Sequence, residues 1–484
     1  MKAVKLKTEY LKNPLGIDIK NPRFMWNCEG GKAQSAYRIV ASDTRGNILW
    51  DSGKVKSPQM AFIPYPLDTP SRLRVNWKVK LWDENGLEGD WSEPAFFEIG
   101  LRNASDWSAK WITGNYNVNK KQRYPVDCFK KEFECKKPIL SARLYMTACG
   151  LYSAEINGVD FSMPLAPGIT EYRKRIQYQT YDVTSLLHEG ENTICAELAD
   201  GWYRGSVGAW GLKNQYGTET KLLAQLEIKY TDGTVQTVVS DGSWLWSSDG
   251  AIRFADNKDG ERVNANMTAS YSDHAKETKC KVVPSASNNF PIAEKERFKP
   301  KLSVTPSGKK LLDFGQNIAG YVEFEINARE GQKITLEFGE LLRGGELTLE
   351  NIQCRNKHKT TPLQKVEYIC KEGKNHYKTK FAIFGFQYIS VDTDINISPE
   401  NFTAIAVYSD MDETGYFNSS NELLNKFVEA TKWSAKGNST DLPTDCPTRE
   451  RHGWTGDAQI FCKTASYLFD YAPFAEKFVR DMCD

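Results

Sequence analysis

The chain has 484 residues, with 63 basic and 62 acidic side chains and a formal net charge of +1. This balance excludes a strongly basic nucleic-acid-binding surface and gives no reason to expect an anionic membrane as partner. Hydrophobic residues make up 40% of the chain, and no stretch approaches the roughly 20 apolar residues of a membrane span. The sequence therefore predicts a soluble globular protein of about three or four domains.

Cysteine and histidine usage argues against a zinc site. There are 11 cysteines with no CxxC pair and five scattered histidines, at positions 188, 274, 358, 376 and 452. Buried free thiols in a reducing compartment explain this usage. The start, MKAVKLKTEYLKNPLGI, lacks the apolar run of about 7–15 residues found in signal peptides. We expect a cytoplasmic protein, or a periplasmic or secreted one if the N-terminus has been trimmed.

Residues 1–104 are predicted to form a small β-sandwich. Residues 37–41 and 75–81 alternate as strands do, Asn85-Gly86 is a turn signal, and residues 96–99 form a last strand. The segment resembles a fibronectin type III module, which implies a structural or spacing role. A connector is expected over residues 105–130.

A second β-rich unit is predicted over residues 131–285. Its signals are strands at 142–147 and 223–228 and a hairpin turn at Asn157-Gly158. Between these strands lies the glycine-rich run 199–211, which contains several aromatic residues. The unit resembles the N-terminal domain of bacterial α-L-rhamnosidases, which is related to rhamnose-binding carbohydrate modules of family 67 that use calcium.

Two interpretations of this glycine-rich run stay open. In the functional one, a sugar lies on Trp202, Tyr203 or Trp210, and Asp200 and Asn214 supply oxygen ligands to sugar or to Ca²⁺. In the other, the aromatic side chains pack on the sandwich and bind nothing. The resemblance implies calcium, but the sequence shows no legible ligand set for a metal ion.

A third β unit is predicted over residues 296–410. Residues 334–338 alternate as a strand. Segments 312–320 and 381–388 resemble the sandwich domain that precedes the catalytic domain in the bacterial rhamnosidases.

The pattern changes to a helical period in the last unit, residues 411–484. Ser419 and Glu422 have the spacing of a capping box at a helix start, and one face then carries Leu423, Leu424, Phe427, Val428 and Thr431. Further helices are expected from about Asp457 and from about Pro473.

The most informative segment precedes the second of these helices. Residues 441–457 read DLPTDCPTRERHGWTGD, in which prolines prevent a helix and glycines flank a tryptophan. Glycoside hydrolysis needs a carboxylic acid that protonates the leaving oxygen and polar groups that bind sugar hydroxyls. On residue types alone, a charged surface loop with internally paired arginines explains the segment about as well.

The run from Asp445 to Asp457, here called the signature loop, closely resembles the active-site signature of the bacterial α-L-rhamnosidases, glycoside hydrolase family 78. The resemblance implies that Glu450 is the general acid. It also implies that Asp445, Arg449, Trp454 and Asp457 contact rhamnose or fix the surroundings of the acid. The family inverts stereochemistry, so a separate general base is implied, with the two carboxyl groups roughly 6.5–9.5 Å apart.

The expected fold is therefore a series of β-sandwich domains followed by the first helices of an (α/α)₆ barrel. The expected function is inverting hydrolysis of terminal α-L-rhamnosyl linkages, with a rhamnose-containing carbohydrate as partner and no cofactor needed for catalysis. The alternative is a non-catalytic carbohydrate-binding or scaffold protein. The resemblance implies that the general base lies outside residues 1–484, so these residues alone are expected to be inactive. Linkage preference and oligomeric state stay open.

Overall fold

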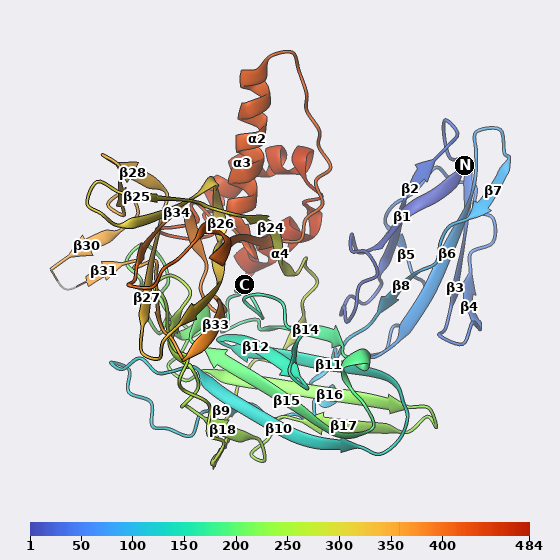
Figure 1. The fold of residues 1–484 in the computed structure, drawn as a ribbon. Helices are drawn as coiled ribbons and strands as arrows, with labels where there is room; N and C mark the ends of the chain where they lie inside the picture. Colours follow the sequence, from blue (N-terminus) through green and yellow to red (C-terminus); the bar gives the residue numbers. More distant parts are fainter. Residues whose placement is uncertain (358) are drawn as a thin grey trace. The chain divides into compact units, whose positions relative to one another are not determined.

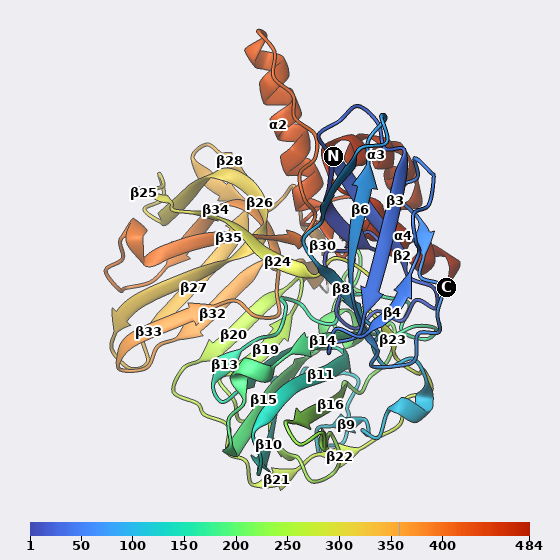
Figure 2. The same cartoon turned by 90° about the vertical axis from the view of Figure 1, so that its right-hand side faces the viewer.

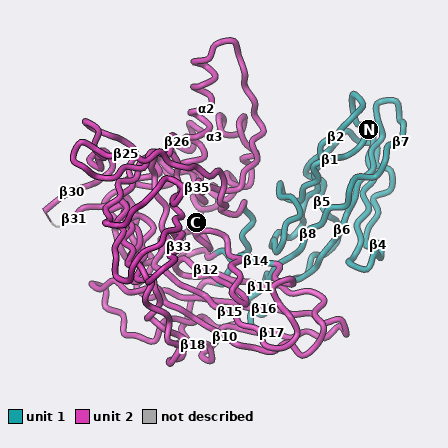
Figure 3. The backbone as a smooth tube through the Cα atoms, in the orientation of Figure 1, with its two compact units in different colours: residues 1–108, 177–181, 283–289 teal, residues 109–176, 182–282, 290–484 magenta. Residues whose placement is uncertain are grey.

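The computed structural model describes residues 1–357 and 359–484; His358, one of the five histidines, lies outside the described residues. The described chain is mostly β-structure with few helices (Figure 1). It divides into two compact units (Figure 3). Unit 1 comprises residues 1–108, 177–181 and 283–289, and unit 2 comprises residues 109–176, 182–282 and 290–484.

Unit 1 is a two-sheet sandwich. Its three-stranded sheet has the order β1-β2-β5, with β1 Lys2–Thr8, β2 Arg23–Glu29 and β5 Ile63–Pro64. Its second sheet has the order β4-β3-β6-β7, with β8 also paired to β6; the bounds are β3 Ala36–Ser42, β4 Ile48–Asp51, β6 Arg74–Trp82, β7 Glu88–Trp91 and β8 Ala95–Glu98. β14, Gln177–Asp182, and β23, Ser285–Ala286, pair in parallel through residues counted with this unit.

Apolar and polar side chains alternate along the strands of unit 1, and the apolar ones form the core between its two sheets. Phe24 and Trp77 face each other across the two sheets, with ring centroids 4.4 Å apart. The predicted strands over 37–41 and 75–81 are present as parts of β3 and β6. Asn85-Gly86 makes the predicted turn, with Gly86 at φ +79°, where a glycine meets no steric penalty.

Unit 2 begins with a second sandwich. One sheet has the order β13-β12-β15-β10-β18-β21, with β10 Asp127–Cys135, β12 Leu151–Ile156, β13 Val159–Asp160, β15 Gly190–Ala199, β18 Leu245–Ser247 and β21 Asp273–His274. The facing strands run β22-β9-β16-β11 with β17 beside β16; the bounds are β9 Ile112–Thr113, β11 Ile139–Cys149, β16 Lys221–Tyr230, β17 Val235–Val239 and β22 Lys276–Glu277. The short helix α1, Gly201–Arg204, lies between β15 and β16.

A ten-stranded sheet forms the next part of unit 2 (Figure 2). Its order is β19-β20-β32-β27-β34-β26-β35-β24, and β25 and β33 also pair with β26. The bounds are β19 Ile252–Asp256, β20 Gly260–Asn264, β24 Ile292–Phe298, β25 Lys301–Val304, β26 Lys310–Ala328, β27 Lys333–Gly339, β32 Lys365–Ile369, β33 Gly373–Lys378, β34 Phe384–Asp392 and β35 Phe402–Ser409. Three short hairpins complete the strands: β28 Leu341–Arg343 with β29 Glu346–Thr348, β30 Cys354–Asn356 with β31 Lys359–Thr361, and β36 Ser439–Thr440 with β37 Leu442–Pro443.

The sheets divide the chain differently from the predicted boundaries. β19 and β20 fall inside the predicted unit 131–285, yet β20 pairs in parallel with β32 and joins the ten-stranded sheet. Buried Glu261 on β20 accepts hydrogen bonds from the backbone N–H groups of Lys380 and Phe381, at 3.0 and 2.6 Å. The expected connector 105–130 in turn contains β9 and the start of β10. These segments have partners distant in sequence, which local alternation does not reveal.

Three longer helices end the chain: α2 Glu422–Gly437, α3 Thr455–Leu468 and α4 Ala472–Cys483. The capping box predicted on Ser419 is wrong. Asn421 is the N-cap residue, and its side-chain oxygen accepts from the N–H groups of Leu423 and Leu424. Ser419 lies outside the helix and instead bonds through its N–H and hydroxyl to the side-chain oxygen of Asn425, in the first turns of α2.

Helix α2 packs on β26 and β35, and its first half projects beyond the sheet (Figures 1 and 2). The predicted apolar face is largely exposed there: Leu423 is 75% and Phe427 68% exposed. The buried residues of α2 are Lys432, Ala435 and Lys436. Over the described residues, each helix is too short or too polar to cross a lipid bilayer.

We predict that the stability of the second sandwich depends on the ionisation of Asp127. This fully buried carboxyl accepts from the indole N–H of Trp246 at 2.9 Å and from the Tyr116 hydroxyl at 3.1 Å. Burial raises the pKa of Asp127 to about 6. A raised folded-state pKa stabilises the fold at low pH, and this stabilisation is lost as pH rises through about 6. Relative to wild type, Asp127→Asn should therefore gain roughly 2 kcal/mol between pH 4 and pH 7.

Thermal unfolding of both proteins across this pH range measures the effect. Asp68→Asn, a change at an exposed carboxylate, is the matched control and should follow wild type. An Asp127→Asn midpoint that runs parallel to the wild-type midpoint from pH 4 to pH 7 would contradict the assignment.

Candidate active site

The signature loop is closed by its own backbone between β37 and α3. The N–H of Asp445 donates to the carbonyl of His452 at 3.1 Å, and the N–H of His452 donates to Asp445 Oδ1 at 3.0 Å. Arg451 lies in the left-handed region at φ +55°, a costly conformation for a residue with a side chain. The loop is therefore held in one defined path from Asp445 to His452.

The carboxyl group of Glu450 lies between two neighbours from the same loop. Arg449 Nη2 is 3.2 Å from Glu450 Oε1, and the indole N–H of Trp454 donates to Glu450 Oε2 at 3.0 Å. The Glu450 side chain is 22% exposed, and Trp454 is 50% exposed. The acid is thus accessible from solvent beside a flat, exposed aromatic face, which is an arrangement suited to a sugar ring.

The structure brings four of the five predicted site residues into one connected group. Arg449 and Trp454 each contact Glu450, and Asp445 closes the loop that carries them. Asp445 Oδ2 has no hydrogen-bond partner among the described residues, so it is available to a hydroxyl group. Asp457 is exposed in the first turn of α3, and within the described chain no hydrogen bond or ion pair joins it to the group.

Arg451 is the buried anchor of the loop. Its guanidinium donates to the carbonyls of Thr448 at 3.2 Å and Asn257 at 2.6 Å, and to Gln364 Oε1 at 3.0 Å. Burial lowers its pKa to about 10, so it stays charged at neutral pH. Gln364 also bonds to the carbonyls of Phe338 and Gly385 in the ten-stranded sheet. The loop is therefore tied to the end of that sheet.

Sequence reasoning missed a second anchor, the turn between β19 and β20. Its residues Asp256, Asn257, Lys258 and Asp259, here called the anchoring turn, are each at most 7% exposed. The ammonium of Lys258 donates to the carbonyl of Arg449 at 2.5 Å. The sequence Asp-Asn-Lys-Asp-Gly is typical of an exposed turn, so no local signal would have revealed its burial.

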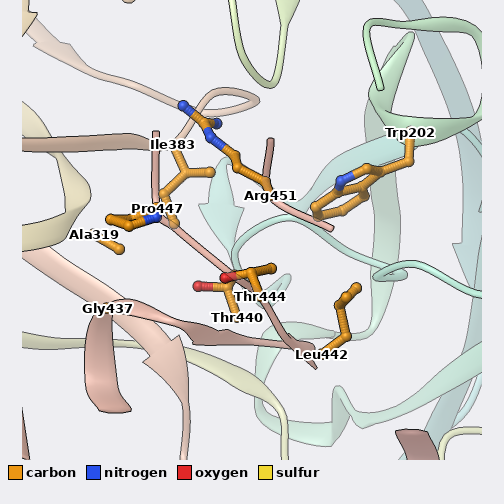
Figure 4. Close-up of a pocket in the computed structure, with 9 residues that line it drawn as sticks. All are labelled: Trp202, Ala319, Ile383, Gly437, Thr440, Leu442, Thr444, Pro447 and Arg451. Carbon is orange, nitrogen blue, oxygen red and sulfur yellow. The ribbon is translucent and has the colours of Figure 1, made fainter. Parts of the chain in front are cut away.

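A small pocket is lined in part by Pro447 and Arg451 of the signature loop (Figure 4). Its walls come from the glycine-rich run, the ten-stranded sheet and the loop region: Trp202, Ala319, Ile383, Gly437, Thr440, Leu442, Thr444, Pro447 and Arg451. Glu450 is not among its lining residues. The pocket is therefore a largely apolar space to which the side chain of the acid does not contribute.

The five residues of the predicted second sugar site do not form one exposed surface. Both oxygens of buried Asp200 are taken by arginines, with Arg204 Nε at 2.6 Å and Arg123 Nε at 3.0 Å. Trp202 is buried in the pocket wall, and the half-buried ring of Tyr203 packs edge-on against a neighbouring tyrosine ring. These contacts fit the packed-loop interpretation for all three residues. Trp210 is 53% exposed, and Asn214 is half-buried at φ +58°.

Of the two predicted oxygen ligands, Asp200 is not available to a calcium ion. The Asp200 carboxylate already has two cationic partners. Across the described ranges, no group of three or more His, Cys, Asp and Glu side chains is placed to hold a metal. The calcium implied by the resemblance stays a prediction.

Four family models match successive parts of the chain. They are described as the Rha78A-like N-terminal immunoglobulin domain over residues 3–103, the alpha-L-rhamnosidase N-terminal domain over 137–300, the bacterial alpha-L-rhamnosidase concanavalin-like domain over 303–408 and the bacterial alpha-L-rhamnosidase 6 hairpin glycosidase domain over 412–484. The first sandwich is thus immunoglobulin-like, where the sequence suggested a fibronectin type III module; both are two-sheet sandwiches.

Curated relatives and solved structures agree with these matches. Alpha-L-rhamnosidases of Alteromonas sp. and Formosa agariphila are each 34% identical to this chain over 97% and 96% of its length, and the matches cover 54% and 53% of their own lengths. The chain therefore spans about half the length of these curated relatives.

Two crystal structures superpose closely. The native rhamnosidase of Aspergillus terreus has a TM-score of 0.93 at 30% identity, covering 99% of this chain and 57% of that one. The Streptomyces avermitilis alpha-L-rhamnosidase complexed with L-rhamnose has a TM-score of 0.91 at 25% identity, covering 98% and 64%. With its domain matches and its signature loop, the chain belongs to the bacterial α-L-rhamnosidases of glycoside hydrolase family 78.

Proposed function

We propose that the protein containing this chain hydrolyses terminal α-L-rhamnosyl linkages in glycans or glycosides, with Glu450 as general acid. The observation that carries the proposal is the solvent-accessible Glu450 carboxyl, held between Arg449 and Trp454. The non-catalytic alternative fits less well, because a loop that only bound sugar would not need an acid in this position.

The proposed chemistry follows from that geometry. Glu450 gives its proton to the glycosidic oxygen as the bond from that oxygen to C1 of rhamnose breaks. Water attacks C1 from the opposite face and gives a proton to a second carboxylate, which inverts the configuration. We propose that this base lies in the part of the relatives' catalytic domain that this chain does not match.

The other loop residues receive binding roles in this proposal. Asp445 Oδ2 accepts from a sugar hydroxyl, and Arg449 donates to one. The exposed Trp454 ring covers an apolar face of the sugar. Asp457, exposed just beyond Trp454 on the first turn of α3, is left to contact a sugar hydroxyl.

We further propose that α2, α3 and α4 are the first helices of an (α/α)₆ barrel. Exposed apolar side chains on all three support this: Leu423 and Phe427 on α2, Ile460 on α3, and Val479 and Met482 on α4. A helix that exposes such a surface is suited to pack against further helices.

Glu450→Gln in the full-length protein should lower turnover of a rhamnose disaccharide by about 10²–10⁴-fold, because general acid catalysis contributes this much. An activated aryl rhamnoside should lose less, since its leaving group needs less protonation. Steady-state kinetics on both substrates measure the difference. Glu476→Gln, at an exposed position on α4, should behave as wild type. Near-normal disaccharide turnover by Glu450→Gln would remove Glu450 from the acid role.

Asp445→Asn and Trp454→Ala should each weaken rhamnose binding by roughly ten-fold, about 1.4 kcal/mol. Asparagine keeps the oxygen that closes the loop on His452 but removes the charge. Calorimetric titration of rhamnose into proteins that also carry Glu450→Gln separates binding from turnover. Trp454→Phe is the matched control, because it keeps an apolar ring and should retain most of the affinity. If both test variants bind rhamnose as the parent does, the two residues only support the loop.

A further inference from the structure

We propose that Lys258 is a positioning residue for the general acid: its buried ammonium fixes the backbone of Arg449 and Glu450 and so sets the direction of the Glu450 carboxyl. This inference rests on the function proposed above. Lys258 lies nearly 200 residues before the signature loop in the sequence and on a different structural element, β19–β20.

The contacts of the ammonium are all to backbone carbonyls. Lys258 Nζ is 2.5 Å from the Arg449 oxygen and 3.4 Å from the Glu450 oxygen, and it also donates to the carbonyl of Gly208. An ammonium has three hydrogens, so these three acceptors use its full capacity. Two consecutive carbonyls that converge on one cation restrict the peptide plane between Arg449 and Glu450, from which the acid side chain projects.

The backbone that carries Lys258 is also held in place by hydrogen bonds. Asp256 Oδ1 accepts the N–H groups of Lys258 and Asp259, both at 3.0 Å. Asp259 Oδ1 accepts from the Thr361 hydroxyl and the Leu363 N–H, both at 3.1 Å. The anchoring turn therefore cannot move without breaking bonds to the segment that leads from β31 into β32.

Burial of this charge is costly and needs compensation. Lys258 is 1% exposed, and burial lowers its pKa to about 8 although the charges of Asp256 and Asp259 in the same turn act to raise it. An isolated buried cation costs several kcal/mol, which an apolar side chain of the same length would avoid. The three carbonyl contacts offset that cost, and two of them belong to the acid and the residue before it.

The same ammonium brings a loop of the second sandwich to the site. Through the Gly208 carbonyl it joins the glycine-rich run to the signature loop. A Cβ added to Gly208 would lie 2.4 Å from His452 Nε2, so the two loops touch. Lys258 thus connects three segments at the acid, whereas Arg451 holds the loop one step earlier, at Thr448.

Lys258→Met in the full-length protein tests the positioning role. Methionine keeps much of the side-chain volume but removes all three donors. If the general acid is misplaced, kcat falls most for substrates whose leaving group needs protonation. We expect kcat for a rhamnose disaccharide to fall by about 10–100-fold, within the range that general acid catalysis contributes. An aryl rhamnoside with a good leaving group should lose only a few-fold, and KM should change little for both substrates.

Lys310→Met is the matched control. The Lys310 ammonium also bonds two backbone carbonyls, those of Thr393 and Ile395 at 3.0 and 2.8 Å, in the same ten-stranded sheet. It is outside the contacts of the signature loop, so its variant should keep the wild-type dependence on leaving group. Lys258→Arg, which restores charge and donors, should recover part of the disaccharide rate.

Amide hydrogen exchange gives a readout that is independent of activity. In Lys258→Met, exchange should accelerate over residues 445–452 while β26 and β34 stay protected as in wild type. Equal losses of kcat on both substrates, or unchanged exchange in the loop, would overturn the positioning role. If Lys258→Met does not fold, the leaving-group comparison is made on Lys258→Gln, whose shorter, uncharged side chain cannot serve all three carbonyls; a wild-type profile there overturns the role as well. Wild-type protein that releases no rhamnose would refute the proposed function, while the exchange experiment would still test the anchor.

Discussion

Two buried cations hold the signature loop by its backbone, and the geometry of the candidate site depends on them. Arg451 gives its donors to Thr448, Asn257 and Gln364, and Lys258 gives its donors to Arg449, Glu450 and Gly208. Each cation would cost several kcal/mol to bury alone. Both are tolerated because carbonyl and amide oxygens replace the water they lose. The loop is therefore well placed only when the ten-stranded sheet and the anchoring turn are folded.

Anchoring through carbonyls has a consequence for the chemistry. A loop held by its side chains would use up the groups that a substrate needs. Here the interior contacts are made by the backbone and by Arg451, so the side chains of Arg449, Glu450 and Trp454 remain at the accessible surface. The two oxygens of the Asp445 carboxylate have separate roles. Oδ1 accepts from the N–H of His452 and closes the loop, and Oδ2 is left for a ligand.

Short-range features were predictable from the sequence, and long-range ones were not. The turns at Asn85-Gly86 and Asn157-Gly158 require left-handed backbone, which those residue types allow. The signature loop was recognisable because it is one continuous segment. The anchoring turn was not, because its burial depends on pairing of β20 with β32, about 100 residues later. Asp200 was misleading for the same reason: Arg123, one of its two partners, comes from a segment that was expected to be a connector.

The orientation of helix α2 on the β-structure is set by ion pairs as well as by apolar contacts. An isolated surface helix would place its apolar stripe on the sheet, but α2 buries Lys432 and Lys436 instead. Their ammonium groups pair with Glu413 at 3.1 and 2.7 Å, and Lys436 also pairs with Glu296 of β24 at 2.9 Å. These ion pairs fix which face of α2 meets the β-structure. Since they occupy the inner face, the apolar residues Leu423 and Phe427 are turned away from the sheet, at 75% and 68% exposed.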